Sequence, residues 1–219
     1  MILKLYKTDT SPPARAIMML LDILKLPYEA IEINIRNKDH LTPEYLKINP
    51  VHTVPVLVDG DLIIQDSHAA LMYLVDKYAK DDALYPKDVA KRALVNQKLF
   101  FDTCFIYFRL KVIAQGVFYQ GQKTICTDKQ RSDVIEAYGF IEQYLSKSKF
   151  LAGNEVTIAD LSAIAYVTTS VLMIPLDPEK FPLTDAWIKY FEKEPYVQKF
   201  NTPGALKLAE TIRIFSEYN

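Results

Sequence analysis

The sequence changes character at residues 80–87, and this change limits the chain to a fold with two differently built parts. Before this segment, short alternating or apolar stretches predict strands that lie between helical segments. Beyond it, we find only helical periodicity and no pair of strands. The segment itself is polar, contains a proline and has the composition of a linker. We therefore expect an α/β domain at residues 1–80 and an all-helical domain at residues 88–219.

The sequence pattern of residues 1–80 predicts the element order βαβαββα. Strands are indicated at residues 2–6, 28–34, 54–58 and 62–64. Helices are expected at residues 12–24, 42–46 and 67–78. Asp59-Gly60-Asp61 is a hairpin signal between the last two strands, and Ser11 and Ser67 are expected as helix N-caps. This order predicts a right-handed parallel crossover followed by an antiparallel hairpin.

The second part predicts helices throughout. They are expected at residues 88–119, 128–146, 157–176, 186–194 and 203–217. Thr157-Ile158-Ala159-Asp160 has the form of a capping box, with aspartate in the place of glutamate or glutamine. The run at residues 161–176 is apolar on all sides, so we expect this helix in the core.

Pro55 lies inside a strand pattern, although proline has no N–H to donate to a sheet. Such a proline marks a strand start, an edge or a bulge, and its X-Pro bond can be cis. A cis bond after Val54 would leave the Val54 backbone free to pair with a short extended peptide. His52 and the sequence Asp66-Ser67-His68 lie nearby. Together these residues indicate a site for a small, charged, peptide-like ligand; the alternative is a proline-started strand beside a polar loop.

The composition argues against several classes of function. The formal net charge of −1 gives no global field that favours nucleic acid or an acidic membrane. No apolar run reaches the roughly 18 residues of a membrane span, and the first residues lack a signal-peptide pattern. Cys104 and Cys126 form no CxxC motif, and with three scattered histidines they do not predict zinc. We expect a cytoplasmic protein without a metal, a nucleic-acid partner or a membrane contact.

Five motifs together resemble the cytosolic glutathione S-transferases over essentially the whole chain. The motifs are Ser11-Pro12-Pro13-Ala14-Arg15-Ala16, Asn49-Pro50-Val51-His52-Thr53-Val54-Pro55-Val56-Leu57, Asp66-Ser67-His68-Ala69, Leu84-Tyr85-Pro86, and Ala152-Gly153 with Thr157-Ile158-Ala159-Asp160. The first three are similar to the insect delta/epsilon group, and the third is most like the epsilon class. The resemblance implies a thioredoxin-like N-terminal domain, an all-helical C-terminal domain that carries an electrophile pocket, and a symmetric homodimer.

The resemblance implies that Ser11 is the catalytic residue. Its hydroxyl would donate a hydrogen bond to the glutathione sulfur, which favours the thiolate. The helix N-terminus behind it would add positive potential. Pro12 and Pro13 have no N–H groups that compete for the hydroxyl. The residues alone allow the simpler role of an ordinary N-cap.

The resemblance also implies a set of glutathione contacts. The set is His40, His52, Val54, Pro55, Asp66 and Ser67. The two histidines would bind the glycine carboxylate, and the Val54 backbone would bind the cysteinyl part. Ser67 would bind the γ-glutamyl carboxylate at a helix N-terminus, and Asp66 its ammonium. Relatives commonly carry glutamate at the position of Asp66. Without the resemblance, these residues are surface histidines and a helix-capping pair.

The electrophile pocket is expected on the first long helix of the second domain. Phe105, Phe108, Arg109 and Val112 follow i, i+3, i+4, i+7 spacing and therefore share one face. With Pro13, they would line a hydrophobic substrate pocket between the domains, where Arg109 meets anionic parts of the substrate. The alternative is an aromatic core beside an arginine that extends to solvent.

We therefore expect a glutathione transferase that joins the glutathione thiolate to hydrophobic electrophiles in detoxification, with hydroperoxide reduction as an additional reaction. Glutathione would be a cosubstrate, and no cofactor is implied. The apolar side of residues 67–78 and the start of residues 88–119 would form the dimer interface. The competing function is a non-catalytic carrier of hydrophobic ligands or an interaction module. A thioredoxin-like oxidoreductase is a third option, but Ser11-Pro12-Pro13-Ala14 has no cysteine. The physiological second substrate stays open between xenobiotics, endogenous aldehydes and steroid-pathway compounds.

Overall fold

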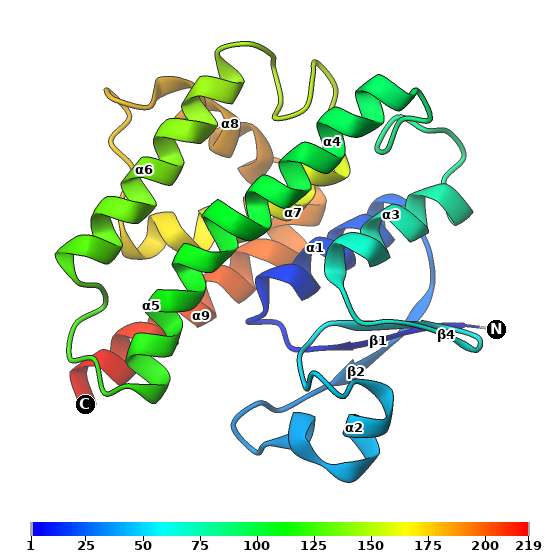
Figure 1. Ribbon diagram of the computed structural model, residues 1–219, viewed down its shortest axis with the longest axis horizontal. Helices are drawn as coiled ribbons and strands as arrows, with labels where there is room; N and C mark the ends of the chain where they lie inside the picture. The colour runs from blue at the N-terminus through cyan, green and yellow to red at the C-terminus, as the bar shows by residue number, and fades with distance from the viewer. Residues whose placement is uncertain (1, 219) are drawn as a thin grey trace.

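The computed structural model describes residues 2–218 and consists of a sheet domain followed by a helical domain (Figure 1). This confirms the expected fold class of a thioredoxin-like βαβαββα domain joined to an all-helical domain. Met1 and Asn219, at the outer ends of the two expected domains, lie outside the described residues.

The sheet has four strands in the order β2-β1-β3-β4. Their bounds are Leu3–Lys7 for β1, Tyr28–Glu32 for β2, Val56–Asp59 for β3 and Leu62–Ile64 for β4. β1 is parallel to β2 and antiparallel to β3, and β3 is antiparallel to β4. The carboxyl ends of β1, β2 and β4 and the amino end of β3 therefore lie together at one end of the strands. We refer to this end of the strands as the sheet edge.

Helices cover both faces of the sheet because successive strand residues point to opposite sides. Leu5 and Leu57 are fully buried on the face covered by α1 (Pro12–Ile23) and α3 (Ser67–Tyr78). Val56 packs with Tyr45 on the other face, under α2 (Pro43–Ile48). Figure 1 shows α2 on one side of the strands and α1 and α3 on the other. A short 3₁₀ helix before α2, η1 (Asp39–Leu41), was not expected from the sequence.

The helical domain differs from the sequence-based expectation in its first helix. In place of one helix over residues 88–119, α4 (Val89–Phe101) and α5 (Phe108–Tyr119) flank a π-helical segment, η2 (Asp102–Tyr107). The remaining elements are α6 (Asp128–Leu145), α7 (Ile158–Met173), α8 (Pro182–Glu192), the π-helical η3 (Val197–Asn201) and α9 (Thr202–Tyr218). α7 is buried along most of its length, as its all-round apolar sequence predicts.

The helix caps agree with the sequence at two positions and correct it at a third. Ser11 caps α1, and Thr157 with Asp160 forms the capping box of α7. For α3 the expectation was wrong, because the N-cap is Asp66 rather than Ser67. The Asp66 carboxylate accepts the Ala69 N–H at 2.8 Å, and Ser67 is already the first helical residue.

Asp59 ties the end of β3 to α3. Its Oδ2 accepts hydrogen bonds from Lys77 Nζ at 2.6 Å, Tyr73 OH at 2.6 Å and Tyr78 OH at 2.5 Å. These donors, Lys77 first, lower the pKa of Asp59 to about 2. The folded state therefore favours the charged carboxylate, whose stabilising effect is complete above the unfolded pKa of 3.8 and is lost as the pH falls toward 2.

We predict that the free energy of unfolding decreases by about 1 kcal/mol through Asp59 as the pH is lowered from about 5 to about 2. Urea denaturation at a series of pH values should show this decrease in the wild type and not in Asp59→Asn. Asp61→Asn, two residues along the same turn, is the control and should keep it. Equal pH profiles for the wild type and Asp59→Asn would contradict the prediction.

Candidate functional site

The sheet topology brings the expected site residues to one edge. Tyr6 lies opposite Val56, and Leu57 lies opposite Ile64. The loop after β1, the start of β3 and the loop after β4 therefore adjoin. Figure 1 shows that α1 and α3 both start beside this end of the sheet. The positive ends of two helix dipoles consequently face the same region, which suits an anionic ligand.

Ser11 caps α1 only weakly. Its Oγ accepts the Ala14 N–H at 3.4 Å, which is long for such a bond. Pro12 and Pro13 follow directly, so the first turn offers no other N–H to this oxygen until Ala14. Within residues 2–218 no acceptor is found for the Ser11 hydroxyl proton. The hydroxyl can therefore donate to a ligand atom while it remains the cap.

Arg15 supports the loop that carries Ser11, a role that the sequence did not predict. The guanidinium is fully buried. Its partners are the carbonyl oxygens of Asp9, Thr10 and Ala165, the side-chain amide oxygen of Asn201 and the hydroxyl of Thr169, at 2.7–3.4 Å. No carboxylate in the described part of the chain forms an ion pair with it. Burial lowers the pKa of Arg15 to about 9, so it stays charged at neutral pH and adds positive potential behind Ser11.

His40 and His52 lie together in the region between β2 and β3. Their ring centroids are 6.3 Å apart. His52 has the left-handed backbone conformation, with φ of 51°. Burial, followed by the neighbouring His52, lowers the pKa of His40, so His40 is neutral at neutral pH. Its Nδ1 is buried without a hydrogen-bond partner among the described residues. A neutral imidazole there can offer a hydrogen bond but no charge.

The Val54-Pro55 bond is cis, as the sequence predicts. The preceding carbonyl, that of Thr53, is occupied by Tyr45 OH at 2.6 Å and Asn49 Nδ2 at 2.9 Å. By contrast, no partner for the Val54 N–H or C=O is found within the described chain. Pro55 is buried directly before β3. The Val54 backbone therefore presents one free donor and one free acceptor at the sheet edge.

A second polar cluster that the sequence did not predict holds the first turn of α3. His68 Nε2 lies 2.8 Å from Ser162 Oγ and 3.2 Å from Asp102 Oδ2, and Ser162 donates to the same oxygen at 2.5 Å. Asp102 and Ser162 are fully buried in η2 and α7. This cluster links the helical domain to the residue after Ser67. The motif Ser67-His68-Ala69 indicated the histidine, but no sequence spacing indicated Asp102.

The four residues expected on one face of the electrophile pocket line the same groove. Phe105, Phe108, Arg109 and Val112 line one groove of about 380 Å³, but they share it with residues of α6. Pro13 is not among the lining residues, and no described residue of the sheet domain is. Arg109 forms an ion pair with Glu136 of α6 at this groove. The role of these residues toward a hydrophobic substrate stays a prediction.

A different aromatic cluster lies near the sheet edge. Phe118 of α5 packs edge-to-face against Phe215 of α9, with centroids 5.3 Å apart. Arg36, in the loop after β2, lies 5.0 Å above the Phe215 ring. α9 also contacts the loop after β1, since a Cβ on Gly204 would lie 2.1 Å from the Asp9 carbonyl oxygen. The cluster therefore joins α5, α9 and the loop after β2.

Two further searches bear on what the site could hold. Among residues 2–218, no group of three or more histidine, cysteine, aspartate or glutamate side chains could hold a metal ion. None of the helices described has both the length and the apolar character to cross a membrane.

Comparisons with known proteins find the same family in both domains of the chain. Residues 5–82 match the family model of the glutathione S-transferase N-terminal domain, and residues 94–195 match that of the C-terminal domain. Glutathione S-transferase 1 of Manduca sexta is 40% identical over 93% of this chain and 94% of its own. An epsilon-class glutathione S-transferase from the housefly, Musca domestica, has a TM-score of 0.94 at 41% identity, with 97% and 98% of the two chains covered. A glutathione transferase homologue from Drosophila mojavensis, solved with bound glutathione, has a TM-score of 0.93 at 40% identity, with 97% of each chain covered.

Proposed function

The chain belongs to the glutathione S-transferase family and is a glutathione transferase, and we propose that it joins the glutathione thiolate to apolar electrophiles at the sheet edge that carries Ser11. Glutathione is the cosubstrate. The observation that carries the proposal is the Ser11 hydroxyl, whose proton has no acceptor in the described chain, at the start of α1.

In the proposed complex, the sheet edge holds glutathione along its length. The free N–H and C=O of Val54 pair with the cysteinyl residue, as in the addition of a strand. Ser67 and the amino end of α3 bind the γ-glutamyl carboxylate. Asp66 is exposed, and its carboxylate can meet the γ-glutamyl ammonium while it still caps α3. His40 and His52 bind the glycine carboxylate at the other end.

The proposed chemistry uses Ser11 to stabilise a thiolate. The Ser11 O–H donates to the sulfur, and the start of α1 and the buried Arg15 add positive potential. The sulfur lone pair then forms the S–C bond, and its electrons displace the leaving group or saturate a conjugated double bond that takes up a proton. The same thiolate could attack a hydroperoxide oxygen and release the alcohol. A second glutathione would then complete the reduction, yielding water and glutathione disulfide.

We place the apolar second substrate beside Phe118 and Phe215. These rings lie on α5 and α9, and Arg36 at the cluster's edge adds a cation for anionic substituents. The groove with Phe105, Phe108, Arg109 and Val112 is the alternative pocket. There, the charge of Arg109 is already matched by Glu136.

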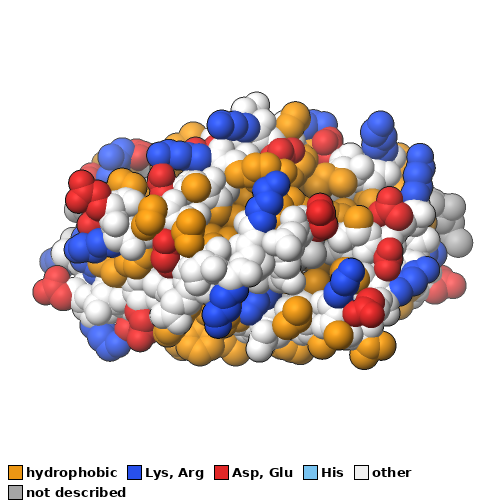
Figure 2. Space-filling model, turned by 90° about the horizontal axis from the view of Figure 1, so that it is seen from above, with side chains coloured by type: hydrophobic (Ala, Val, Ile, Leu, Met, Phe, Trp, Pro, Cys, Tyr) orange, Lys and Arg blue, Asp and Glu red, His pale blue; other side chains and the backbone are white. Residues whose placement is uncertain are grey.

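We further propose a cytoplasmic homodimer that acts in detoxification, with the domains at residues 1–80 and 88–219. Large apolar side chains are exposed on α4: Val89, Leu94 and Phe100. Figure 2 shows one face of the molecule, seen from above, on which hydrophobic side chains gather near the middle among charges of both signs. Exposed apolar surface of this kind supports an interface with a second copy.

A steady-state assay with glutathione and a chlorinated nitroaromatic tests the proposed function. We expect saturable conjugate formation well above the uncatalysed rate. A protein that binds glutathione and the aromatic but shows no turnover would instead be the non-catalytic carrier considered above.

We predict that Ser67→Ala and His52→Ala raise KM for glutathione about five-fold or more, while kcat changes less. Both side chains would hold carboxylates remote from the sulfur, so they contribute equally to ground-state and transition-state binding. Glutathione titrations at saturating electrophile measure this. Ser146→Ala, at the exposed end of α6, is the control and should leave KM unchanged. Unchanged KM values in the first two variants would remove both residues from the site.

A further inference from the structure

We propose that the Tyr166 hydroxyl is a further contact of glutathione and donates a hydrogen bond to its γ-glutamyl carboxylate. This contact rests on the glutathione site proposed above and adds to it a residue of the helical domain. Tyr166 lies in α7 and is 4% exposed. Most of α7 is buried, so its position alone would indicate an ordinary core residue.

The hydroxyl of Tyr166 differs from those of the other buried tyrosines. Among the described residues four tyrosines are buried, and three of them donate to a carbonyl or amide oxygen at 2.6–3.0 Å: Tyr45, Tyr85 and Tyr138. No partner for the Tyr166 hydroxyl is found in the same part of the chain. Buried polar groups are almost always hydrogen-bonded. The Tyr166 oxygen is not one of the fully enclosed atoms without a partner, so a ligand atom can still reach it.

Tyr166 lies between the two polar clusters that hold the starts of α3 and α1. One turn before it, Ser162 lies 2.8 Å from His68 Nε2. One turn after it, the Thr169 hydroxyl accepts a hydrogen bond from Arg15 at 2.7 Å. These positions follow i, i+4, i+7 spacing, so the three α7 side chains share one face. Tyr166 therefore faces the gap between the two helix starts, where the proposed glutathione site lies.

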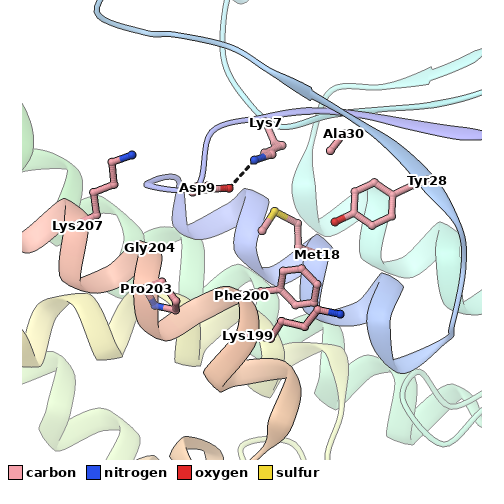
Figure 3. A pocket seen from close by; sticks show the side chains of 10 residues that line it. All are labelled: Lys7, Asp9, Met18, Tyr28, Ala30, Lys199, Phe200, Pro203, Gly204 and Lys207. Carbon is pink, nitrogen blue, oxygen red and sulfur yellow. Dashed lines mark hydrogen bonds and ion pairs between the residues drawn. The ribbon is translucent and has the colours of Figure 1, made fainter.

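Two other sides of Tyr166 are closed. The Tyr107 ring of η2 packs against it with centroids 5.6 Å apart. On the side of Arg15, α9 is so close that a Cβ on Gly204 would lie 2.6 Å from Arg15 Cδ. The cavity beyond this contact is lined by residues of β1, β2, α1, η3, α9 and the loop after β1, and Tyr166 is not among them (Figure 3). That cavity gives no route to the hydroxyl, which leaves the sheet edge as the side of approach.

The charges around Tyr166 suit a hydrogen bond to a carboxylate. Burial, followed by the charge of Asp102, raises the pKa of Tyr166, so its hydroxyl stays protonated and can donate. The charges of Arg15 and Asp66 also act on this hydroxyl. Arg15 attracts an anion, and Asp66 is the proposed contact of the γ-glutamyl ammonium. The ammonium and the carboxylate are attached to the same carbon atom of the ligand. A ligand whose ammonium meets Asp66 therefore brings its carboxylate close to Tyr166.

Titration calorimetry with two S-hexyl ligands tests this contact. One is S-hexylglutathione, and the other is S-hexyl-(4-aminobutanoyl)cysteinylglycine, which lacks only the γ-glutamyl carboxylate. The hexyl chain adds affinity to both ligands, and its thioether sulfur is only a weak hydrogen-bond acceptor. We expect Tyr166→Phe to raise the Kd of S-hexylglutathione about ten-fold, the effect of one hydrogen bond to a charged group. The Kd of the second ligand should be the same in the wild type and the variant.

Tyr138→Phe is the matched control. The Tyr138 hydroxyl is also buried in the helical domain, but it donates to the Ile174 carbonyl oxygen at 3.0 Å. Its removal should lower the urea midpoint and leave both Kd values within about two-fold of the wild type. Tyr166→Phe removes no hydrogen bond within the described chain, so its urea midpoint without ligand should not fall.

The contact is refuted if Tyr166→Phe leaves the Kd of S-hexylglutathione unchanged or weakens both ligands equally. A wild type that does not bind S-hexylglutathione would overturn the proposed glutathione site together with this contact. Binding without turnover in the assay with the chlorinated nitroaromatic would count against the proposed catalysis alone, because calorimetry does not depend on turnover.

Discussion

Replacing Arg15 with methionine is expected to lower the free energy of unfolding by about 3 kcal/mol or more. Methionine fills much of the same volume but donates no hydrogen bonds. The carbonyl oxygens of Asp9, Thr10 and Ala165 would lose their guanidinium donor. The side-chain amide oxygen of Asn201 would lose its donor as well. Removing an unpaired buried charge returns part of this cost. The variant leaves several buried acceptors without a donor, and each of them destabilises the fold by about 1–3 kcal/mol. Together these costs exceed the gain from removing the charge.

The matched control is Arg92→Met. Arg92 also donates to two loop carbonyls, those of Tyr85 and Pro86, and it pairs with Asp76. Its side chain is 28% exposed, however, so water can replace its bonds. Urea denaturation should show a loss below about 1.5 kcal/mol for Arg92→Met. Equal losses in the two variants would contradict the role given to burial at Arg15. If Arg15→Met does not fold, Arg15→Lys replaces it as the test variant and should give a stable protein with reduced kcat. Lysine keeps the positive charge but lacks the planar set of N–H donors that holds the loop before Ser11.

Replacing Ser11 with alanine is expected to lower kcat about ten-fold or more, which is the order of effect for the loss of one donor to developing charge. KM for glutathione should change less, because the rest of the tripeptide keeps its contacts. Stability should decrease by no more than about 1 kcal/mol, since the cap bond is long. Steady-state kinetics and urea denaturation measure the two effects separately.

Thr42→Ala is the matched control for Ser11→Ala. Thr42 caps α2 through an equivalent bond to the Tyr45 N–H at 3.3 Å, and a proline follows it, as after Ser11. It has no part in the proposed chemistry. We therefore expect a similar loss of stability without the loss of kcat. If the two variants had the same kcat, Ser11 would be an N-cap and nothing more.

The sequence predicted those features that depend on neighbouring residues. The alternation of Leu3 and Leu5, the cap at Ser11 and the capping box at Thr157 and Asp160 all follow from local spacing, and the structure confirms them. The error at Asp66 and Ser67 is also local. Either side chain can cap a helix, and only the backbone conformation decides which one does.

Contacts between distant parts of the chain could not be predicted in this way. Periodicity showed that Phe105, Phe108, Arg109 and Val112 share a face, but it could not show that α6 would line the same groove or that Glu136 would pair with Arg109. The π-helical turn at η2 is set by packing, because an uninterrupted helix satisfies the same apolar pattern.

The two buried polar clusters show the same limit more clearly. Arg15 and Asn201 are separated by 186 positions, and His68 and Ser162 by 94. Both clusters join the sheet domain to the helical domain beneath the proposed site. A single sequence carries the residues of such a cluster but no signal that pairs them.

The most direct test of the account is the pKa of the glutathione thiol in the bound complex, followed by the ultraviolet absorbance of the thiolate across a pH titration. With the wild-type protein, we expect this pKa to lie well below the ordinary cysteine value of about 8.5. In Ser11→Ala it should rise by about one unit, and in Thr42→Ala it should equal the wild-type value. A bound thiol whose pKa is the same in the wild type and Ser11→Ala would contradict the claim that Ser11 activates glutathione.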